Sequence, residues 1–180
     1  HIIKKLYEIG EIGKAYNLIK SIDKDSITDD KYLNYFHLIE LNYLFSTFKL
    51  SEVCELKSSL MNKNISFDHS LLEKTDIFCL TLEDKFSEAK LLNSLLIESE
   101  KNIDQSFQSL FNYMILKDQN TLNLNELSAV KFPELIFLYS AMLRINELPL
   151  NEKFIEIDPI NLTIPVILSE TTEMETRIKA

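Results

Sequence analysis

Turn-forming residues are scarce in this sequence. Its 180 residues include two glycines, four prolines and no tryptophan. Tight β-hairpins and dinucleotide-binding loops both require glycine at particular turn positions, so all-β and dinucleotide-binding folds are disfavoured and α-helix is the simplest prediction. The same scarcity argues against a glycine-rich phosphate loop and against a nucleophilic serine in a glycine elbow.

Long apolar runs and an excess of positive charge are also missing. The longest apolar run, Leu135 to Leu143 with Ser140 inside it, is far shorter than the ~20 residues of a membrane span. The formal net charge of −9 repels phosphate backbones and anionic lipid surfaces. We therefore expect no nucleic-acid partner and no membrane-spanning segment.

The sequence contains only two cysteines, Cys54 and Cys79, which lie on apolar helical segments. They form no C-x-x-C motif and have no histidine nearby. Free cysteine packs as a small hydrophobe, so we expect both to be reduced thiols in the core. A disulfide between successive helical hairpins is the alternative, and the compartment stays open between the cytoplasm, which is preferred, and an exported location.

One turn sequence occurs three times. It reads E-I-G-K-A at residues 11–15, K-L-S-E-V at 49–53 and K-F-S-E-A at 85–89, with spacings of 38 and 36 residues. Apolar residues follow each copy at helical intervals, which predicts one buried stripe per helix. Self-similarity at this period is typical of stacked helical hairpins.

These turns carry a family resemblance. Residues 84–90, D-K-F-S-E-A-K, resemble the inter-helix turn and alanine of tetratricopeptide repeats, and residues 9–16, I-G-E-I-G-K-A-Y, are similar to the same element. The resemblance covers residues 1 to about 100; the chain departs from the family in lacking tryptophan and any proline before residue 133. It implies an all-α fold, a right-handed α-α superhelix of tetratricopeptide-like hairpins with irregular C-terminal helices.

Apolar periodicity and capping residues place the individual helices. We predict helices over residues 2–9, 11–22, 29–47 and 49–62, then one from a loop at 62–68 to about residue 82, and one over 83–99. Thr28 is the predicted N-cap of the third helix, and Asn102 caps a further helix that has Asp104 in its first turn. The third helix is apolar on nearly every face, so it must pack between neighbours.

From about residue 118 the repeat is lost. We expect an irregular connection with one helical turn near Glu126, a strongly buried helix that begins at Pro133, and short elements separated by the later prolines. The last ten residues are amphipathic and begin another helix. Residues 1–180 are therefore interpreted as one helical-repeat domain with a degenerate cap, expected to be part of a longer chain.

Catalytic and metal-binding patterns are not recognisable. His37 and Glu40 have the i, i+3 spacing that some helical bundles use for metals, but the further histidine and carboxylates of such a site are missing, so a structural role is expected. Paired carboxylates lie at helix starts or on charged faces, where the helix dipole stabilises them. We predict no enzyme activity, no cofactor and no metal.

The expected function is therefore a surface for a protein or peptide. In a tetratricopeptide-like superhelix the first helices of the hairpins line the concave side, so the third helix would present either the stripe Phe36, Ile39 and Tyr43 or the face one residue back. Core packing is the alternative role of that stripe.

A second candidate surface is the polar stripe Gln105, Ser109 and Asn112, which could bind the amides of an extended peptide or simply be solvated. The leading interpretation is a non-catalytic interaction module. The alternatives are the non-catalytic superhelical arm of a larger enzyme and the peptide-sensing domain of a transcription regulator.

Overall fold

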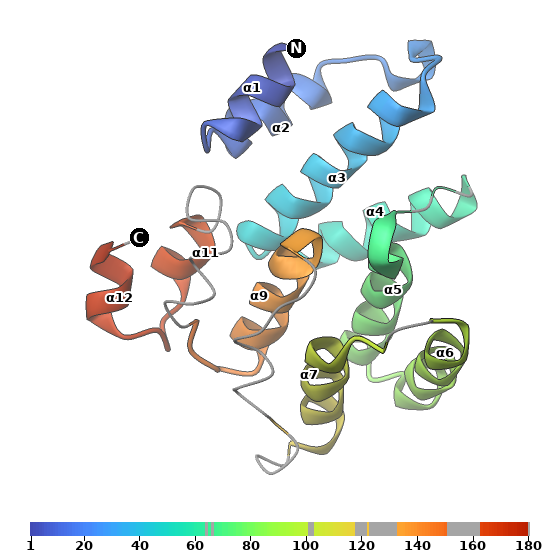
Figure 1. Ribbon diagram of the computed structural model, residues 1–180, viewed down its shortest axis with the longest axis vertical. Helices are drawn as coiled ribbons and strands as arrows, with labels where there is room; N and C mark the ends of the chain where they lie inside the picture. Colours follow the sequence, from blue (N-terminus) through green and yellow to red (C-terminus); the bar gives the residue numbers. More distant parts are fainter. Residues whose placement is uncertain are drawn as a thin grey trace.

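All regular secondary structure in the described part of the chain is helical (Figure 1). This computed structural model describes residues 1–63, 65, 67–100, 103–117, 122, 133–150 and 163–179. The α-helices are α1 (Ile2–Glu8), α2 (Ile12–Lys20), α3 (Asp30–Ser46), α4 (Leu50–Asn62), α5 (Leu71–Leu82), α6 (Phe86–Ser99), α7 (Gln105–Leu116), α9 (Ile136–Ile145), α11 (Thr163–Leu168) and α12 (Met174–Lys179). Short 3-10 helices are η1 (Lys24–Ser26), η2 (Asp68–Ser70) and η4 (Pro133–Leu135). The predicted all-α class is confirmed.

Three helix-to-helix corners are built alike. The central residue of each has a left-handed backbone, with φ of 82° at Gly10, 60° at Phe48 and 59° at Asp84. The next N–H donates to the carbonyl five residues earlier, at 2.8 to 2.9 Å, which is the hydrogen bond of a Schellman C-cap. Positions 10, 48 and 84 are separated by 38 and 36 residues, which are the spacings of the three similar turn sequences.

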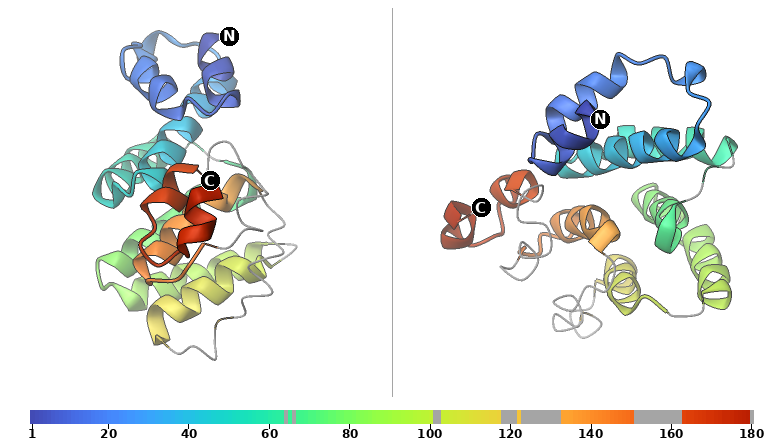
Figure 2. Two further views of the ribbon diagram at one scale, coloured as in Figure 1. Left: turned by 90° about the vertical axis from the view of Figure 1, so that its left-hand side faces the viewer. Right: turned by 45° about the horizontal axis from the view of Figure 1, so that its top comes forward.

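The small residue that ends each repeated turn sequence has a packing role. Ala15, Val53 and Ala89 are all fully buried, and each N–H donates at 3.0 Å to the carbonyl four residues before it. A larger side chain there would hold the paired helices apart. From α1 to α6 each helix packs on the next one in the chain (Figures 1 and 2).

After α6 the order of packing changes. Helix α7 packs against α5, and α9 packs against both α3 and α7. Every residue from Leu135 to Leu143 is buried, which confirms the predicted burial of this segment. At the end of α9 the Arg144 guanidinium donates to the Ser46 carbonyl at 3.0 Å and lies 4.2 Å from the ring centre of Phe48.

Two predicted N-caps differ from the observed ones. Asp29, not Thr28, caps α3 by accepting from the Lys31 N–H at 2.9 Å. Asp104 caps α7 by accepting from the Phe107 N–H at 3.2 Å, while Asn102 lies outside the described residues. In both helices a carboxylate supplies the cap and also interacts favourably with the helix dipole.

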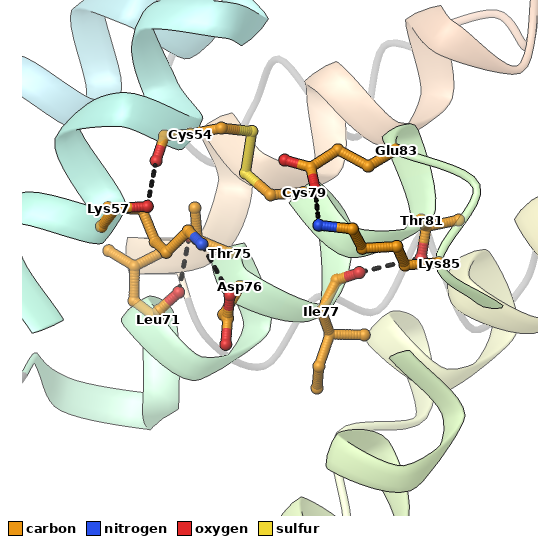
Figure 3. Close-up of a disulfide and its surroundings, with 11 residues drawn as sticks. Cys54, Lys57, Leu71, Thr75, Asp76, Ile77, Cys79, Thr81, Glu83 and Lys85 are labelled. Atoms are coloured by element: carbon orange, nitrogen blue, oxygen red, sulfur yellow. Dashed lines mark hydrogen bonds and ion pairs between the residues drawn. A yellow bond between two sulfur atoms is a disulfide. The ribbon is translucent and has the colours of Figure 1, made fainter. Parts of the chain in front are cut away.

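The expectation of two reduced thiols is wrong. Cys54 of α4 and Cys79 of α5 form a disulfide, with 5.7 Å between their Cα atoms (Figure 3). One turn away, the Lys57 ammonium donates to the Asp76 carboxylate at 2.7 Å across the same pair of helices. Because α4 packs on α5, residues 25 positions apart in the sequence face one another, which spacing alone did not indicate.

The C-terminal part contains two short helices, α11 and α12, which pack on each other. The predicted turn near Glu126 and the predicted element at residues 150–157 lie outside the described residues, apart from Leu150. Within the described ranges, no helix combines the length and the apolar character that crossing a bilayer would require.

Candidate functional site

A groove of about 200 Å³ lies beside the N-terminal half of α3, between this helix and the segments that open α5 and α9. We call it the α3 groove and define it by its lining: Asn34, Tyr35, Leu38, Phe67, Asp68, Leu71 and Glu134. Three of these residues come from one face of α3, because positions 34, 35 and 38 are neighbours on a helix. The others come from the segment that leads into α5, from Leu71 at the start of α5 and from η4.

The α3 groove has an apolar floor and a polar rim. Leu71 is buried, and Leu38 and Phe67 are partly buried against the core. In the part of the rim that the structure describes there are one amide, one phenol and two carboxylates. An apolar surface with a few convergent polar groups is the usual composition of a binding site.

Most polar groups of the rim have no partner among the described residues. Neither the Asn34 amide, the Tyr35 hydroxyl nor the Asp68 carboxylate has a hydrogen-bond partner in the described part of the chain. Burial, and secondarily the charge of Glu8, raises the pKa of Tyr35, so its hydroxyl remains a donor at neutral pH. The Tyr35 ring is held by an edge contact with Tyr7, at 6.4 Å between ring centres.

The rim beside α5 has an unusual backbone. His69 and Ser70 both have left-handed φ, 55° and 54°, which costs a residue other than glycine roughly 1–2 kcal/mol. The buried Lys74 ammonium stabilises this turn by donating to the His69 carbonyl at 2.8 Å. The turn places the His69 imidazole 3.6 Å from the Glu134 carboxylate of the facing rim.

Lys74 itself belongs to a buried network that joins α5, α7 and α9. Its ammonium donates to Glu100 at 2.7 Å and lies 3.4 Å from Asp104, and the Tyr139 hydroxyl donates to the same Asp104 carboxylate. Burial, followed by the charge of Asp104, raises the pKa of Tyr139 and keeps it a neutral donor. Packing among three helices therefore sets the position of the groove rim.

The predicted stripe on α3 does not line this groove. Ile39 is fully buried, and Phe36 is partly buried against the core. Tyr43 stacks on Tyr16 of α2, with 4.1 Å between the ring centres.

The face one residue back is the one that the groove uses. Tyr35 and Leu38 line it, and on the same face the Asn42 amide donates to the Tyr7 hydroxyl at 2.9 Å. Three further lining residues, Phe67, Asp68 and Glu134, are distant from α3 in the sequence. No local sequence pattern predicts that they lie beside this helix.

The polar stripe predicted on α7 is not brought to the α3 groove either. Gln105 and Asn112 are exposed, whereas Ser109 is buried. None of the three lines a groove of the described residues that we identify, so this stripe contributes nothing to the site built here.

His37 and Glu40 form a buried pair within α3. The Glu40 carboxylate receives hydrogen bonds from His37 Nδ1 at 2.9 Å and from the Lys24 ammonium at 2.5 Å. Burial alone would raise the pKa of Glu40, but these hydrogen bonds and the charge of Lys24 outweigh it and lower the pKa. In the described ranges no three His, Cys, Asp or Glu side chains are grouped to hold a metal.

A second hollow of about 180 Å³ lies between α2, α3 and α4. Its lining includes Glu40, Glu52 and Glu55, together with Lys20. Two of these carboxylates already have lysine partners, since Glu40 binds Lys24 and Glu52 lies 3.3 Å from Lys49. The described lining of this hollow has the same formal charge, −2, as that of the α3 groove, but two of its three carboxylates are already paired with lysines.

Comparisons with protein-family models, with curated proteins and with solved structures return no match to this chain. The class that the fold defines is accordingly an all-helical protein built on paired helices with equivalent corners.

Proposed function

We propose that this chain is a non-catalytic interaction module whose α3 groove holds a segment of a partner protein. The observation that carries the proposal is the set of open polar groups around an apolar floor. Asn34, Tyr35 and Asp68 can each form a hydrogen bond with a ligand without breaking one inside the described structure. A partner segment would satisfy them and cover Leu38 and Leu71 at the same time.

The size of the α3 groove favours a polypeptide over a small-molecule substrate. Small-molecule sites typically occupy about 300–1,000 Å³ and enclose most of their ligand. This groove measures about 200 Å³ and is only partly enclosed. It suits one or two side chains of a longer segment, whose remaining residues would lie along α3.

We further propose that the three helical pairs form a right-handed tetratricopeptide-like superhelix. The equivalent corners at Gly10, Phe48 and Asp84 and the successive packing from α1 to α6 support this arrangement. In it the inner side would be formed by α1, α3, α5 and α7, and α9 would fill part of that side. The α3 groove is then the part of the inner side that α9 leaves open.

The disulfide indicates the kind of cellular compartment in which the proposed module would function. A bond between Cys54 and Cys79 persists in oxidising compartments and is rare where glutathione keeps thiols reduced. We therefore propose an exported or otherwise oxidising location in place of the cytoplasmic preference. Alkylation of free thiols in intact source cells, before lysis, should leave both cysteines unmodified.

Site-specific photo-crosslinking tests the proposed function. A benzoylphenylalanine replacing Leu38 on the groove floor should crosslink one partner from extracts of the source cells. The same group replacing Leu91, an exposed residue of α6, serves as the matched control. Capture of the same proteins at both positions would show that the α3 groove has no partner of its own.

A further inference from the structure

We infer that the partner segment anchors itself by inserting a lysine or arginine side chain into the α3 groove. This inference rests on the proposed function and adds the chemistry of the ligand. The described lining residues include two carboxylates, Asp68 and Glu134, and neither lysine nor arginine. The formal charge of these described residues is therefore −2, and a basic side chain is complementary to it.

The carboxylates of the α3 groove are less satisfied than those of the other hollow. Asp68 has no ion pair within the described structure, and Glu134 has one contact, a long one of 3.6 Å to the His69 imidazole. In the hollow between α2 and α4, by contrast, lysines are already bonded to Glu40 and Glu52. An incoming cation is stabilised most by carboxylates that have no lysine partner, and among the described residues this favours the α3 groove.

The walls of the groove suit the remainder of a basic side chain. The methylene stem of lysine or arginine is apolar and packs well on surfaces such as Leu38, Leu71 and Phe67. The faces of Tyr35 and Phe67 can also attract the cation through their ring quadrupoles. The Asn34 amide oxygen supplies one further acceptor for an N–H donor.

Other occupants fit less well. An acidic side chain would be repelled by both carboxylates, and an apolar side chain would displace water from Asp68 without replacing its hydrogen bonds. The net charge of −9 also draws basic segments toward this chain from a distance. That attraction alone is not specific, so the test must separate it from binding in the groove.

Peptide display provides the test. Random peptides about twelve residues long are selected on the oxidised chain 1–180, and each recovered peptide is then measured by fluorescence anisotropy against variants. Leu38→Ala identifies peptides that depend on the groove floor. The double variant Asp68→Asn/Glu134→Gln removes the groove charge, and Glu52→Gln/Glu55→Gln removes two charges from the other hollow as the matched control.

The expected result is a set of floor-dependent peptides that share a lysine or arginine at one position. Neutralising the groove should weaken them about 10- to 100-fold, because each exposed or half-exposed charge pair contributes about 3- to 10-fold. The matched control should stay within about 2-fold, since it changes the net charge by the same amount. Circular dichroism of each variant confirms that the helices are retained.

Each other outcome is decisive. Floor-dependent peptides without a fixed basic position, or equal losses in the groove and control variants, would overturn the basic anchor while leaving the groove a binding site. Failure to recover any floor-dependent peptide would overturn the proposed function, and the anchor with it.

Discussion

Removal of the disulfide should destabilise the chain by an amount that its loop length sets. The perturbation is reduction of Cys54–Cys79, or the double variant Cys54→Ala/Cys79→Ala. The bond joins residues 25 positions apart. In the chain-entropy relation, crosslinking a loop of this length stabilises the folded state by about 3.5 kcal/mol, because it restricts the unfolded chain.

The same junction retains its other contacts after reduction. The hydrogen bond from Lys57 to Asp76 and the packing of α4 on α5 do not depend on the sulfur atoms. We therefore expect a loss of stability without separation of the helices. For a chain of this size, about 3.5 kcal/mol corresponds to a fall in Tm of roughly 7–14 °C.

Guanidinium unfolding followed by circular dichroism measures the effect. The oxidised and reduced forms are compared, and the alanine double variant is unfolded with and without reductant. Reductant should lower the midpoint of the wild type only, while the variant should show the lower midpoint in both buffers. Titration of the denatured, unreduced protein should find no free thiol. Two free thiols, or equal midpoints for the oxidised and reduced wild type, would refute the reasoning.

Three further predictions concern single side chains and are checked by equilibrium unfolding. Lys74→Met removes the cation of the buried network and leaves two carboxylates facing one another, so it should cost about 3–5 kcal/mol. Asp84→Gly relieves a left-handed residue at an exposed corner and should stabilise the chain by about 0.5–1 kcal/mol, whereas Ser87→Gly, inside α6, should destabilise it. Glu40 has a folded pKa below its ordinary 4.5, so its contribution is fully present above pH 4.5 and is lost as the pH falls through the folded pKa. Glu40→Gln should therefore be about 1.5–3 kcal/mol less stable than wild type at pH 7, and this difference should shrink toward pH 3. A Glu40 difference that stays constant to pH 3, a neutral Lys74→Met or a destabilising Asp84→Gly would contradict the respective argument.

The parts of the fold that were predictable depend on local chemistry. A corner needs only a residue that tolerates left-handed φ and, five positions later, a small residue that permits close helix packing. Gly10 with Ala15 and Asp84 with Ala89 provide both within one short stretch of sequence. The helix ranges were predictable for the same reason, since each buried stripe repeats at helical intervals.

The orientation of α3 could not be predicted in this way. The helix is apolar on nearly every face, so its own sequence favours no direction for the core. The packing of neighbouring helices determines its orientation. Tyr43 stacks on Tyr16 of α2, and Ile39 is buried in the core. Tyr35 and Leu38 are consequently left on the open side, one residue back from the predicted stripe.

The disulfide and the groove rim depend on contacts between distant segments. Cys54 and Cys79 face one another only because two helical pairs stack, and Glu134 reaches the groove only because α9 packs on α3. A periodicity argument treats each helix separately, so it has no access to either contact. The same periodicity argument placed Asp104 in the first turn of a helix. In the structure its carboxylate caps α7 and also accepts a hydrogen bond from the Tyr139 hydroxyl.

The disulfide and the α3 groove are linked through the chain between the two cysteines. The loop that the disulfide closes contains the groove residues Phe67, Asp68 and Leu71, and it also contains Lys74, which fixes the His69 carbonyl. Restricting this loop limits the positions that the Asp68 carboxylate can take relative to Tyr35 on α3. A carboxylate held near its bound position loses less conformational entropy when a cation binds, so the oxidised form should bind a basic peptide more tightly than the reduced form. The redox state of a bond that makes no contact with the ligand would thereby set the affinity of the groove.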